Sequence, residues 1–307
     1  MPWSRIISAI VAIALALGML LAGSWYFAAG FMVIVLLGEL EYFRLVRAKG
    51  INPAGKTTLV ISQLLLITAT FNPTLTDAFF PIGGTFICFY LLFQPKLASI
   101  ADISTSILGL FYGGWLPSYW IRLRVGLESH PPILIATNPN ALPQINIGLD
   151  TLPQWETAWW NINHFSPALK ITLIAFACIW AADIGAYLMG KFFGKTRLSE
   201  ISPKKTVEGA AFGILASALV GGWGAWYMQW NAWQISGILL GLLIGVVSLL
   251  GDLTESMMKR DAGVKDSGQL IPGHGGILDR TDSYVFTAPL IYYYVTLFLP
   301  LLPKTLF

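Results

Sequence analysis

The sequence predicts an all-α, polytopic integral membrane protein with about nine transmembrane helices and a cytoplasmic N-terminus. Hydrophobic residues make up 55% of its 307 residues, and the mean hydropathy is +0.66. That is far more apolar than a water-soluble domain. The apolar residues also occur in blocks long enough to cross the bilayer core, which takes about 20 helical residues. The formal charge of +3 is small and dispersed, which argues against nucleic acid as a partner.

Nine apolar ranges account for the predicted helices. One long hydrophilic segment, 121–167, interrupts them; it is rich in Pro and Asn, has few charges and shows no catalytic pattern. We expect it to be an extracytoplasmic connection between N-terminal transmembrane helices over 1–120 and a C-terminal catalytic transmembrane region over 168–307. The predicted spans are 6–22, 25–43, 57–71, 78–94, 103–120, 168–190, 209–228, 235–258 and 284–302.

Basic residues predict the orientation of these spans, because Lys and Arg are enriched in cytoplasmic loops. With the N-terminus inside, 15 of the 19 basic residues fall on the cytoplasmic side. The two conspicuous polar loops, 191–208 and 259–283, then both face the cytoplasm.

The stretch 256–282 concentrates charge between two charge-free apolar runs. Charge next to lipid is costly, so such a stretch indicates polar chemistry at the membrane surface. Its members are Lys259, Arg260, Asp261, Lys265, Asp266, Asp279, Arg280 and Asp282, together with His274.

The helix that leads into this stretch carries polar residues on one face, at helical spacing. Asp252 lies about two turns inside the span, so it must face protein or a watery cavity. One interpretation is a structural ion pair with Lys259 or Arg260, and the other is a metal or phosphate site. The residues on this face are Ser248, Asp252, Glu255, Ser256 and Lys259.

Asp279 and Asp282 lie at the start of the last span and share a face if that turn is helical. Three carboxylates from two helices, Asp252, Asp279 and Asp282, could hold Mg²⁺, a cation that prefers oxygen ligands. The alternative is that either aspartate only caps the helix start.

Two further segments could bind phosphate groups. The glycines around His274, including Gly275 and Gly276, form a loop whose backbone can approach a ligand closely. On the other polar loop, Lys204 and Lys205 follow a Ser-Pro turn, and their simpler explanation is the positive-inside rule. The end of the preceding helix carries Asp183, Tyr187 and Lys191 at a spacing of four residues.

These groups together are typical of phosphoryl or nucleotidyl transfer on a lipid. That chemistry depends on positioning and charge neutralisation rather than on a covalent nucleophile. The sequence contains no P-loop or HExxH motif and no Ser/His/Asp nucleophile pattern.

The stretch 256–282 resembles the phosphatidate cytidylyltransferase family, also called CDP-diacylglycerol synthases, at every fixed position of the family pattern. Segments 183–187 and 202–209 also resemble family blocks, so the likeness covers 180–285 well. Ile184 and Leu249 stand where family members often have Thr and Gln. The matching positions are Ser256, Lys259, Arg260, Lys265, Asp266, Gly268, Pro272, His274, Gly275, Gly276, Asp279, Arg280 and Asp282.

The resemblance implies that CTP and phosphatidate give CDP-diacylglycerol and pyrophosphate, with a cytoplasm-facing site, a membrane-embedded lipid substrate and the option of a homodimer. It implies Mg²⁺, with or without a second cation, on Asp252, Asp279 and Asp282. The implied catalytic residues are these three with Lys259, Arg260 and Arg280. The implied substrate-binding residues are Asp183, Tyr187, Lys204, Lys205, Lys265, Asp266, His274, Gly275 and Gly276.

Two rival functions remain at this point. A CDP-archaeol synthase or a CTP-dependent polyprenol kinase would share the membrane setting and part of the pattern. An ion-coupled transporter would use Asp183 and Asp252 as ion ligands, but it predicts a sequence repeat that is not evident here.

Overall fold

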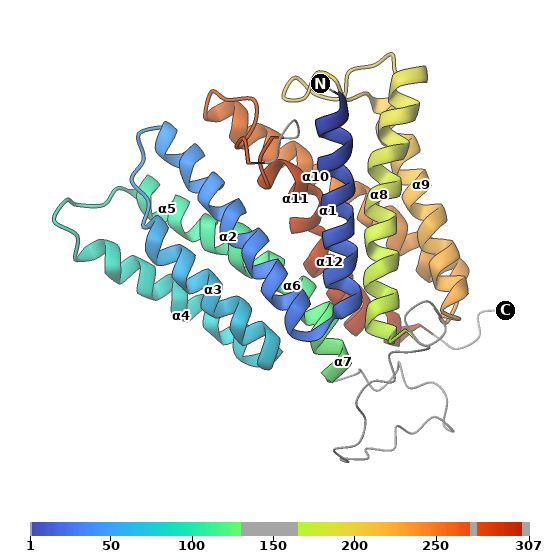
Figure 1. Cartoon of the computed structure of the whole chain (residues 1–307), viewed down its shortest axis with the longest axis horizontal. Helices are drawn as coiled ribbons and strands as arrows, with labels where there is room; N and C mark the ends of the chain where they lie inside the picture. Colours follow the sequence, from blue (N-terminus) through green and yellow to red (C-terminus); the bar gives the residue numbers. More distant parts are fainter. Residues whose placement is uncertain (1, 130–164, 271–274, 303–307) are drawn as a thin grey trace.

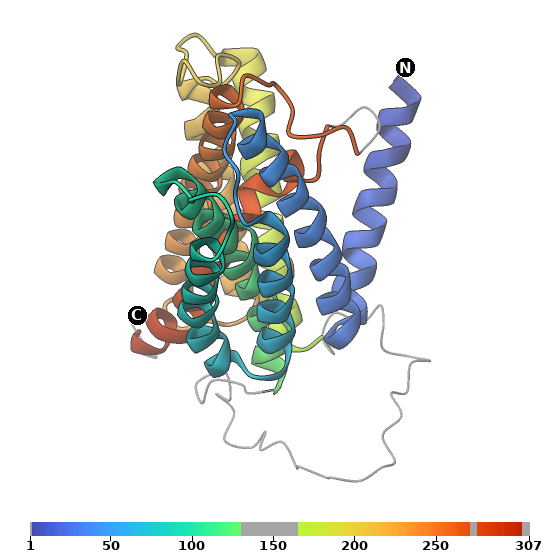
Figure 2. The same ribbon diagram turned by 90° about the vertical axis from the view of Figure 1, so that its left-hand side faces the viewer.

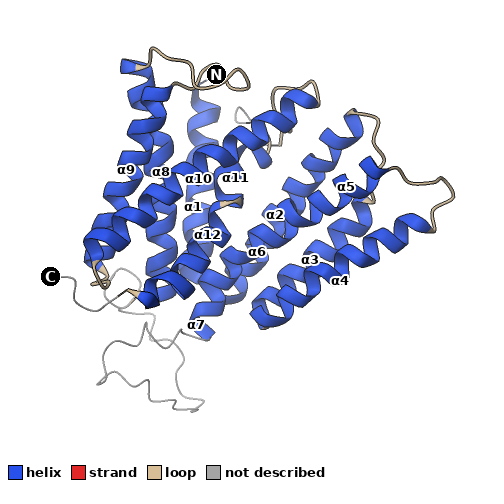
Figure 3. Cartoon of the chain, turned by 180° about the vertical axis from the view of Figure 1, so that it is seen from behind, coloured by secondary structure: helices blue, strands red, loops and turns tan. Residues whose placement is uncertain are grey.

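The computed structural model describes residues 2–129, 165–270 and 275–302, and this part of the chain is helical without any β-strand. The predicted all-α class is therefore confirmed. The helices run roughly alongside one another (Figures 1 and 3). Their bounds are α1 (Pro2–Ala22), α2 (Ser24–Ala48), α3 (Gly55–Phe71), α4 (Pro73–Leu92), α5 (Ile100–Gly109), α6 (Leu116–Ile121), α7 (Leu127–Ser129), α8 (Pro167–Phe193), α9 (Val207–Tyr227), α10 (Trp233–Asp261), α11 (Leu278–Val285) and α12 (Thr287–Tyr293).

Five helical runs in the described residues are long and apolar enough to cross a membrane. They are Leu75–Leu92, Pro167–Phe193, Val207–Tyr227, Trp233–Asp261 and Leu278–Leu301. Shorter apolar helices cover Ile10–Ala22 and Gly55–Phe71. The chain is thus a polytopic membrane protein, as predicted.

The helix predicted over 103–120 continues further than expected. Two π-helical stretches, Leu110–Trp115 and Arg122–Gly126, join α5, α6 and α7 into one run that ends at Ser129. Burial explains the extension, because the side chains of Arg122 and Arg124 are buried within the bundle rather than exposed in a connection. Most of the predicted connection 121–167 lies outside the described residues.

Small residues bring α8, α9 and α10 into backbone contact. A methyl group built on Gly213 of α9 would lie 2.5 Å from the carbonyl oxygen of Ala182 in α8. One built on Gly221 of α9 would lie 2.5 Å from the carbonyl oxygen of Gly237 in α10. Close approach through glycine is a common way for membrane helices to associate. These three helices form the frame that carries the polar loops.

The two polar loops lie at one end of the molecule. The 194–206 loop, the 262–270 loop and the start of α1 are all at the top of Figure 1, and α7 is at the opposite end. Figure 2 shows α1 diverging from the other helices toward its N-terminal end. The arrangement brings segments far apart in the sequence to the same polar end.

Candidate active site

A cavity of about 590 Å³ opens between α8, α9, α10 and α11 at the polar end. It gathers most of the acidic and basic residues that the sequence pointed to. The predicted site residues that line it are Asp183, Tyr187, Lys204, Lys205, Asp252, Asp279, Arg280 and Asp282.

An ion pair between Lys205 and Asp252 joins the two polar segments of the sequence. Both side chains are about one quarter exposed, at 26% and 27%. The other oxygen of Asp252 accepts a hydrogen bond from the Ser256 hydroxyl at 3.3 Å. Asp252 thus forms an ion pair, but with neither of the partners expected from its own helix.

The start of α9 determines where Lys205 lies. Thr206 caps the helix, since its hydroxyl accepts a hydrogen bond from the Gly209 backbone N–H at 3.1 Å. Glu208 in the first turn accepts from the N–H groups of Lys195 and Thr196 at 3.1 and 3.2 Å. These contacts close the loop between α8 and α9 and direct Lys205 toward α10.

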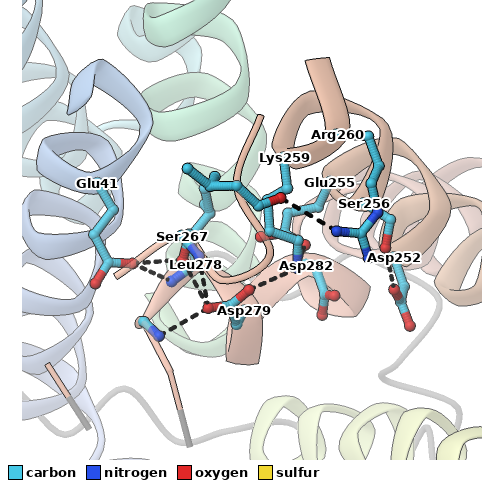
Figure 4. A network of polar contacts seen from close by, with 12 residues as sticks. Glu41, Asp252, Glu255, Ser256, Lys259, Arg260, Ser267, Leu278, Asp279 and Asp282 are labelled. Carbon is cyan, nitrogen blue, oxygen red and sulfur yellow. Dashed lines mark hydrogen bonds and ion pairs between the residues drawn. The ribbon is translucent and has the colours of Figure 1, made fainter. Parts of the chain in front are cut away.

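Asp252 and Asp282 project on the same side of neighbouring helices (Figure 4). Helices α10 and α11 approach closely there, because a methyl group on Gly251 would lie 2.7 Å from the Asp282 backbone oxygen. Asp282 is buried, and one of its oxygens accepts a hydrogen bond from the Ser283 N–H at 2.7 Å. Two carboxylates from two helices therefore face one cavity.

Asp279 organises the loop that precedes α11. One of its oxygens accepts from the Ser267 N–H at 2.9 Å, the Ser267 hydroxyl at 3.0 Å and the Gly276 N–H at 2.8 Å. The other accepts from the Lys259 ammonium at 2.6 Å. Gly275 has a φ of +84°, and a side chain there would also collide with Asp279.

The carboxylates fit a magnesium site only in part. Among the described residues, no three carboxylate, histidine or cysteine side chains are close enough to hold a metal ion by themselves. Proteins usually hold Mg²⁺ with one or two carboxylates while substrate phosphates supply other ligands, and Asp252 with Asp282 matches that donor set. Asp279 does not, because its oxygens already accept four hydrogen bonds from the protein.

Six predicted residues that the structure describes do not line the cavity, namely Lys259, Arg260, Lys265, Asp266, Gly275 and Gly276. Lys259 forms ion pairs with Asp279 and with the buried Glu255, so it ties α10 to α11. Arg260 donates to the backbone oxygens of Ile201 at 3.3 Å and Val264 at 3.2 Å and thereby joins the two polar loops.

Lys265 and Asp266 are exposed on the 262–270 loop. His274 lies outside the described residues.

Glu41 of α2 contacts the loop that precedes α11, although the sequence patterns above did not point to it. It is only 2% exposed, and one of its oxygens accepts from the Ser267 hydroxyl at 3.0 Å and the Leu278 N–H at 2.9 Å. Figure 4 shows it reaching the loop from the side opposite Asp252. A signal did exist, because acidic residues inside a predicted span such as 25–43 are rare and usually functional.

Comparisons with known proteins agree with this geometry. The model of the Cytidylyltransferase family matches residues 3–298. A phosphatidate cytidylyltransferase of Synechocystis sp. is 64% identical over 302 residues, which cover 98% of this chain and 99% of that protein. Phosphatidate cytidylyltransferase 4, chloroplastic, of Arabidopsis thaliana is 39% identical over 285 residues, covering 90% of this chain and 68% of that protein.

A more distant relative matches a smaller part of the chain. The phosphatidate cytidylyltransferase of Bacillus subtilis is 47% identical over 131 residues, or 42% of this chain and 49% of that protein. The family match over nearly the whole length and the 64% identical relative leave no ambiguity. This chain belongs to the cytidylyltransferase family.

Proposed function

We propose that the protein transfers CMP from CTP to phosphatidate, giving CDP-diacylglycerol and pyrophosphate for phospholipid synthesis. The observation that carries this proposal is the meeting of carboxylates from α10 and α11 with lysines of the 194–206 loop in one cavity, in a chain of this family. A phosphate oxygen of phosphatidate attacks the α-phosphorus of CTP. A new P–O bond forms, the bond from that phosphorus to the bridging oxygen breaks, and pyrophosphate leaves with the bond's electrons.

The protein's task in this reaction is to bring two polyanions together. The nucleophile is already an anionic phosphate monoester, so no strong general base is required. Lys204, Lys205 and Arg280 line the cavity and supply positive charge for the phosphate oxygens. Preorganised charge of this kind is the main source of rate enhancement in enzymes that transfer phosphoryl or nucleotidyl groups.

We assign Asp252 and Asp282 as the residues that would hold Mg²⁺. A bound Mg²⁺ would neutralise negative charge on the triphosphate of CTP and on the departing pyrophosphate. Lys205 neutralises Asp252 in the structure described here. If Asp252 held a cation, the Lys205 ammonium would be available to a phosphate oxygen. Asp279 and Lys259 then act indirectly, by holding the loop and α11 in place.

The proposal includes orientation and assembly. We place the polar end, with the start of α1, in the cytoplasm, where CTP is present. The positive-inside bias of the loops supports this placement. The lipid's acyl chains would stay in the bilayer. Homodimer formation, suggested by family resemblance, is testable by the mass of the purified protein in detergent.

One assay tests the reaction and separates it from its rivals. The purified protein in detergent is incubated with phosphatidate, Mg²⁺ and CTP carrying separate labels on the α- and γ-phosphates. We expect the α-label in CDP-diacylglycerol and the γ-label in pyrophosphate. Transfer of the γ-label to an alcohol would indicate a polyprenol kinase, and activity restricted to archaeal ether lipids would indicate a CDP-archaeol synthase.

A further inference from the structure

A second cavity, of about 370 Å³, lies on the other side of α11 between α1, α2 and α8. Its walls are mainly aliphatic and aromatic and include Ala16 of α1, Phe31 of α2 and Trp180 of α8. Arg280 lines both this apolar chamber and the polar cavity. Helix α11 is therefore a partition between an apolar and a polar space, and Arg280 belongs to both.

The chamber extends from the polar end into the depth of the bundle. Phe176 lines it seven positions before Asp183 on α8, which is about 10 Å deeper along the helix axis. Helix α1 forms its outer wall and diverges from the bundle toward the polar end (Figure 2). An apolar space of this depth inside a membrane protein suits a hydrocarbon chain rather than a polar ligand.

We propose that this chamber receives a fatty acyl chain of the lipid substrate. Arg280 then lies at the junction, where the phosphate of the same lipid enters the polar cavity. The proposal rests on the proposed function, since it assumes a substrate with a phosphate at one end and long hydrocarbon chains at the other. Arg280, which lines both cavities, is what identifies the occupant.

Narrowing the chamber tests the proposal. Ala16→Phe adds an aromatic ring to a wall position, and Leu15→Phe is the control, because Leu15 is 63% exposed and does not line the chamber. KM and kcat are measured with dioctanoyl- and dioleoyl-phosphatidate in mixed micelles. We expect Ala16→Phe to raise the KM for the dioleoyl lipid by about tenfold, and for the dioctanoyl lipid by clearly less. Leu15→Phe should change neither.

Three results would overturn the chamber as an acyl site. They are an equal effect of Ala16→Phe on both lipids, no effect on either, or a change confined to oligomeric state, which would make this face an interface between copies. None of these results would contradict the proposed transfer of CMP from CTP to phosphatidate. The proposed function fails only if the unmodified protein makes no CDP-diacylglycerol from either lipid.

A separate observation concerns Glu41, the buried acidic residue of α2 that contacts the loop before α11. Its second oxygen has no hydrogen-bond partner among the described residues. A side chain on either Gly268 or Gly276 would collide with its carboxylate. The loop therefore closes tightly around a carboxylate that comes from the N-terminal half of the chain.

We infer that Glu41 is a positioning residue for the transfer reaction. The Ser267 hydroxyl donates to Glu41 and also lies 3.0 Å from the Asp279 oxygen. The Leu278 N–H, at the start of α11, donates to Glu41 as well. Glu41 thus holds both ends of the loop segment that places Asp279, Arg280 and Asp282 at the cavity.

Comparison with a variant of nearly the same shape distinguishes this role from a general structural one. Glu41→Gln keeps a side-chain oxygen that can accept both hydrogen bonds, whereas Glu41→Ala removes it. We expect Glu41→Ala to lower kcat by about tenfold or more with little change in the KM for CTP, and Glu41→Gln to restore most of it. Ser267→Ala should show a smaller loss, and the double variant should lose less than the product of the two.

The matched control is Glu128, which forms an ion pair with Arg124 and accepts a hydrogen bond from the Ser166 hydroxyl at 2.6 Å, so that it holds the start of α8 at the opposite end. Glu128→Ala should lower thermal stability without changing kcat per folded molecule. If Glu41→Ala lowers activity only in proportion to the folded fraction, as this control does, Glu41 has no positioning role. An equal kcat loss in Glu41→Gln would also contradict it.

Discussion

The molecule carries buried charge at both ends, but the two clusters are built differently. At the polar end, Lys205 and Asp252 pair on the wall of a cavity that Asp282 and Arg280 also line. At the opposite end, Arg122 pairs with Asp77 at 2.8 Å and Arg124 with Glu128 at 2.6 Å. The first cluster lines a cavity that has room for a ligand, and the second has its two arginines packed inside the protein.

The arginines of the far-end cluster lie among protein groups, although Nε and Nη2 of Arg122 have no hydrogen-bond partner among the described residues. The Arg122 guanidinium is 1% exposed and lies 4.4 Å from the centre of the Tyr119 ring. Arg124 donates to the Leu20 backbone oxygen at 3.0 Å. In this protein the charges that line a cavity are therefore the first candidates for contact with a substrate. The following predictions test that distinction, from the largest expected effect to the smallest.

The largest effect is expected for Asp252→Asn. It removes a carboxylate from the cavity and leaves Lys205 facing a neutral amide, so turnover should fall by at least about a hundredfold. CDP-diacylglycerol formation is measured with saturating CTP and Mg²⁺, and insertion is checked by membrane fractionation. Wild-type-like rates under these conditions would remove Asp252 from the site.

Asp77→Asn is the counterpart in the far-end cluster. It leaves the buried Arg122 without its charged partner, which should cost about 2 kcal/mol, less than a fully buried pair because Asp77 is 53% exposed. Thermal unfolding in detergent measures the loss, and kcat/KM should stay unchanged. A specific fall in kcat/KM would show that the two ends are coupled.

Lys204→Ala should raise the KM for CTP or phosphatidate by about tenfold, the effect of losing one charge-assisted contact. Lys204 is exposed and lines the cavity. Steady-state kinetics with each substrate varied in turn identify which one it contacts. Unchanged kinetics would leave the positive-inside rule as the sufficient reason for this lysine.

The smallest effect is expected for Thr206→Ala. It removes the cap of α9 beside Lys205 and should cost about 1 kcal/mol of stability. Thr206→Ser keeps the capping hydroxyl and should restore the unfolding temperature. A loss of equal size in both variants would point to packing of the Thr methyl group instead.

Much of the fold follows from local sequence rules. Apolar length predicts the long spans, and the start expected at 168 agrees with α8 beginning at Pro167. The turn containing Asp279 and Asp282 is helical, which is the condition for the two side chains to share a face. The polar-end cavity also contains most of the residues that charge and helical spacing selected.

The limits of prediction lie in contacts between helices. Spacing along α10 indicates which face is polar, but it does not indicate which helix lies opposite that face. Asp252 therefore pairs with Lys205, 47 positions away, and not with Lys259 or Arg260 on its own helix. Glu41 illustrates the same limit, because its partners Ser267 and Leu278 are more than 200 positions away.

The glycine contacts among α8, α9 and α10 limit how far the charged side chains on these helices can move relative to one another. Backbone atoms meet there directly, and backbone atoms have no rotamers to exchange. The three helices in close contact carry the charged side chains of the cavity: Asp183 on α8, Lys205 just before α9 and Asp252 on α10. Close backbone contact leaves these helices little freedom to shift relative to one another. Such a frame can hold opposing charges at a set spacing from one another.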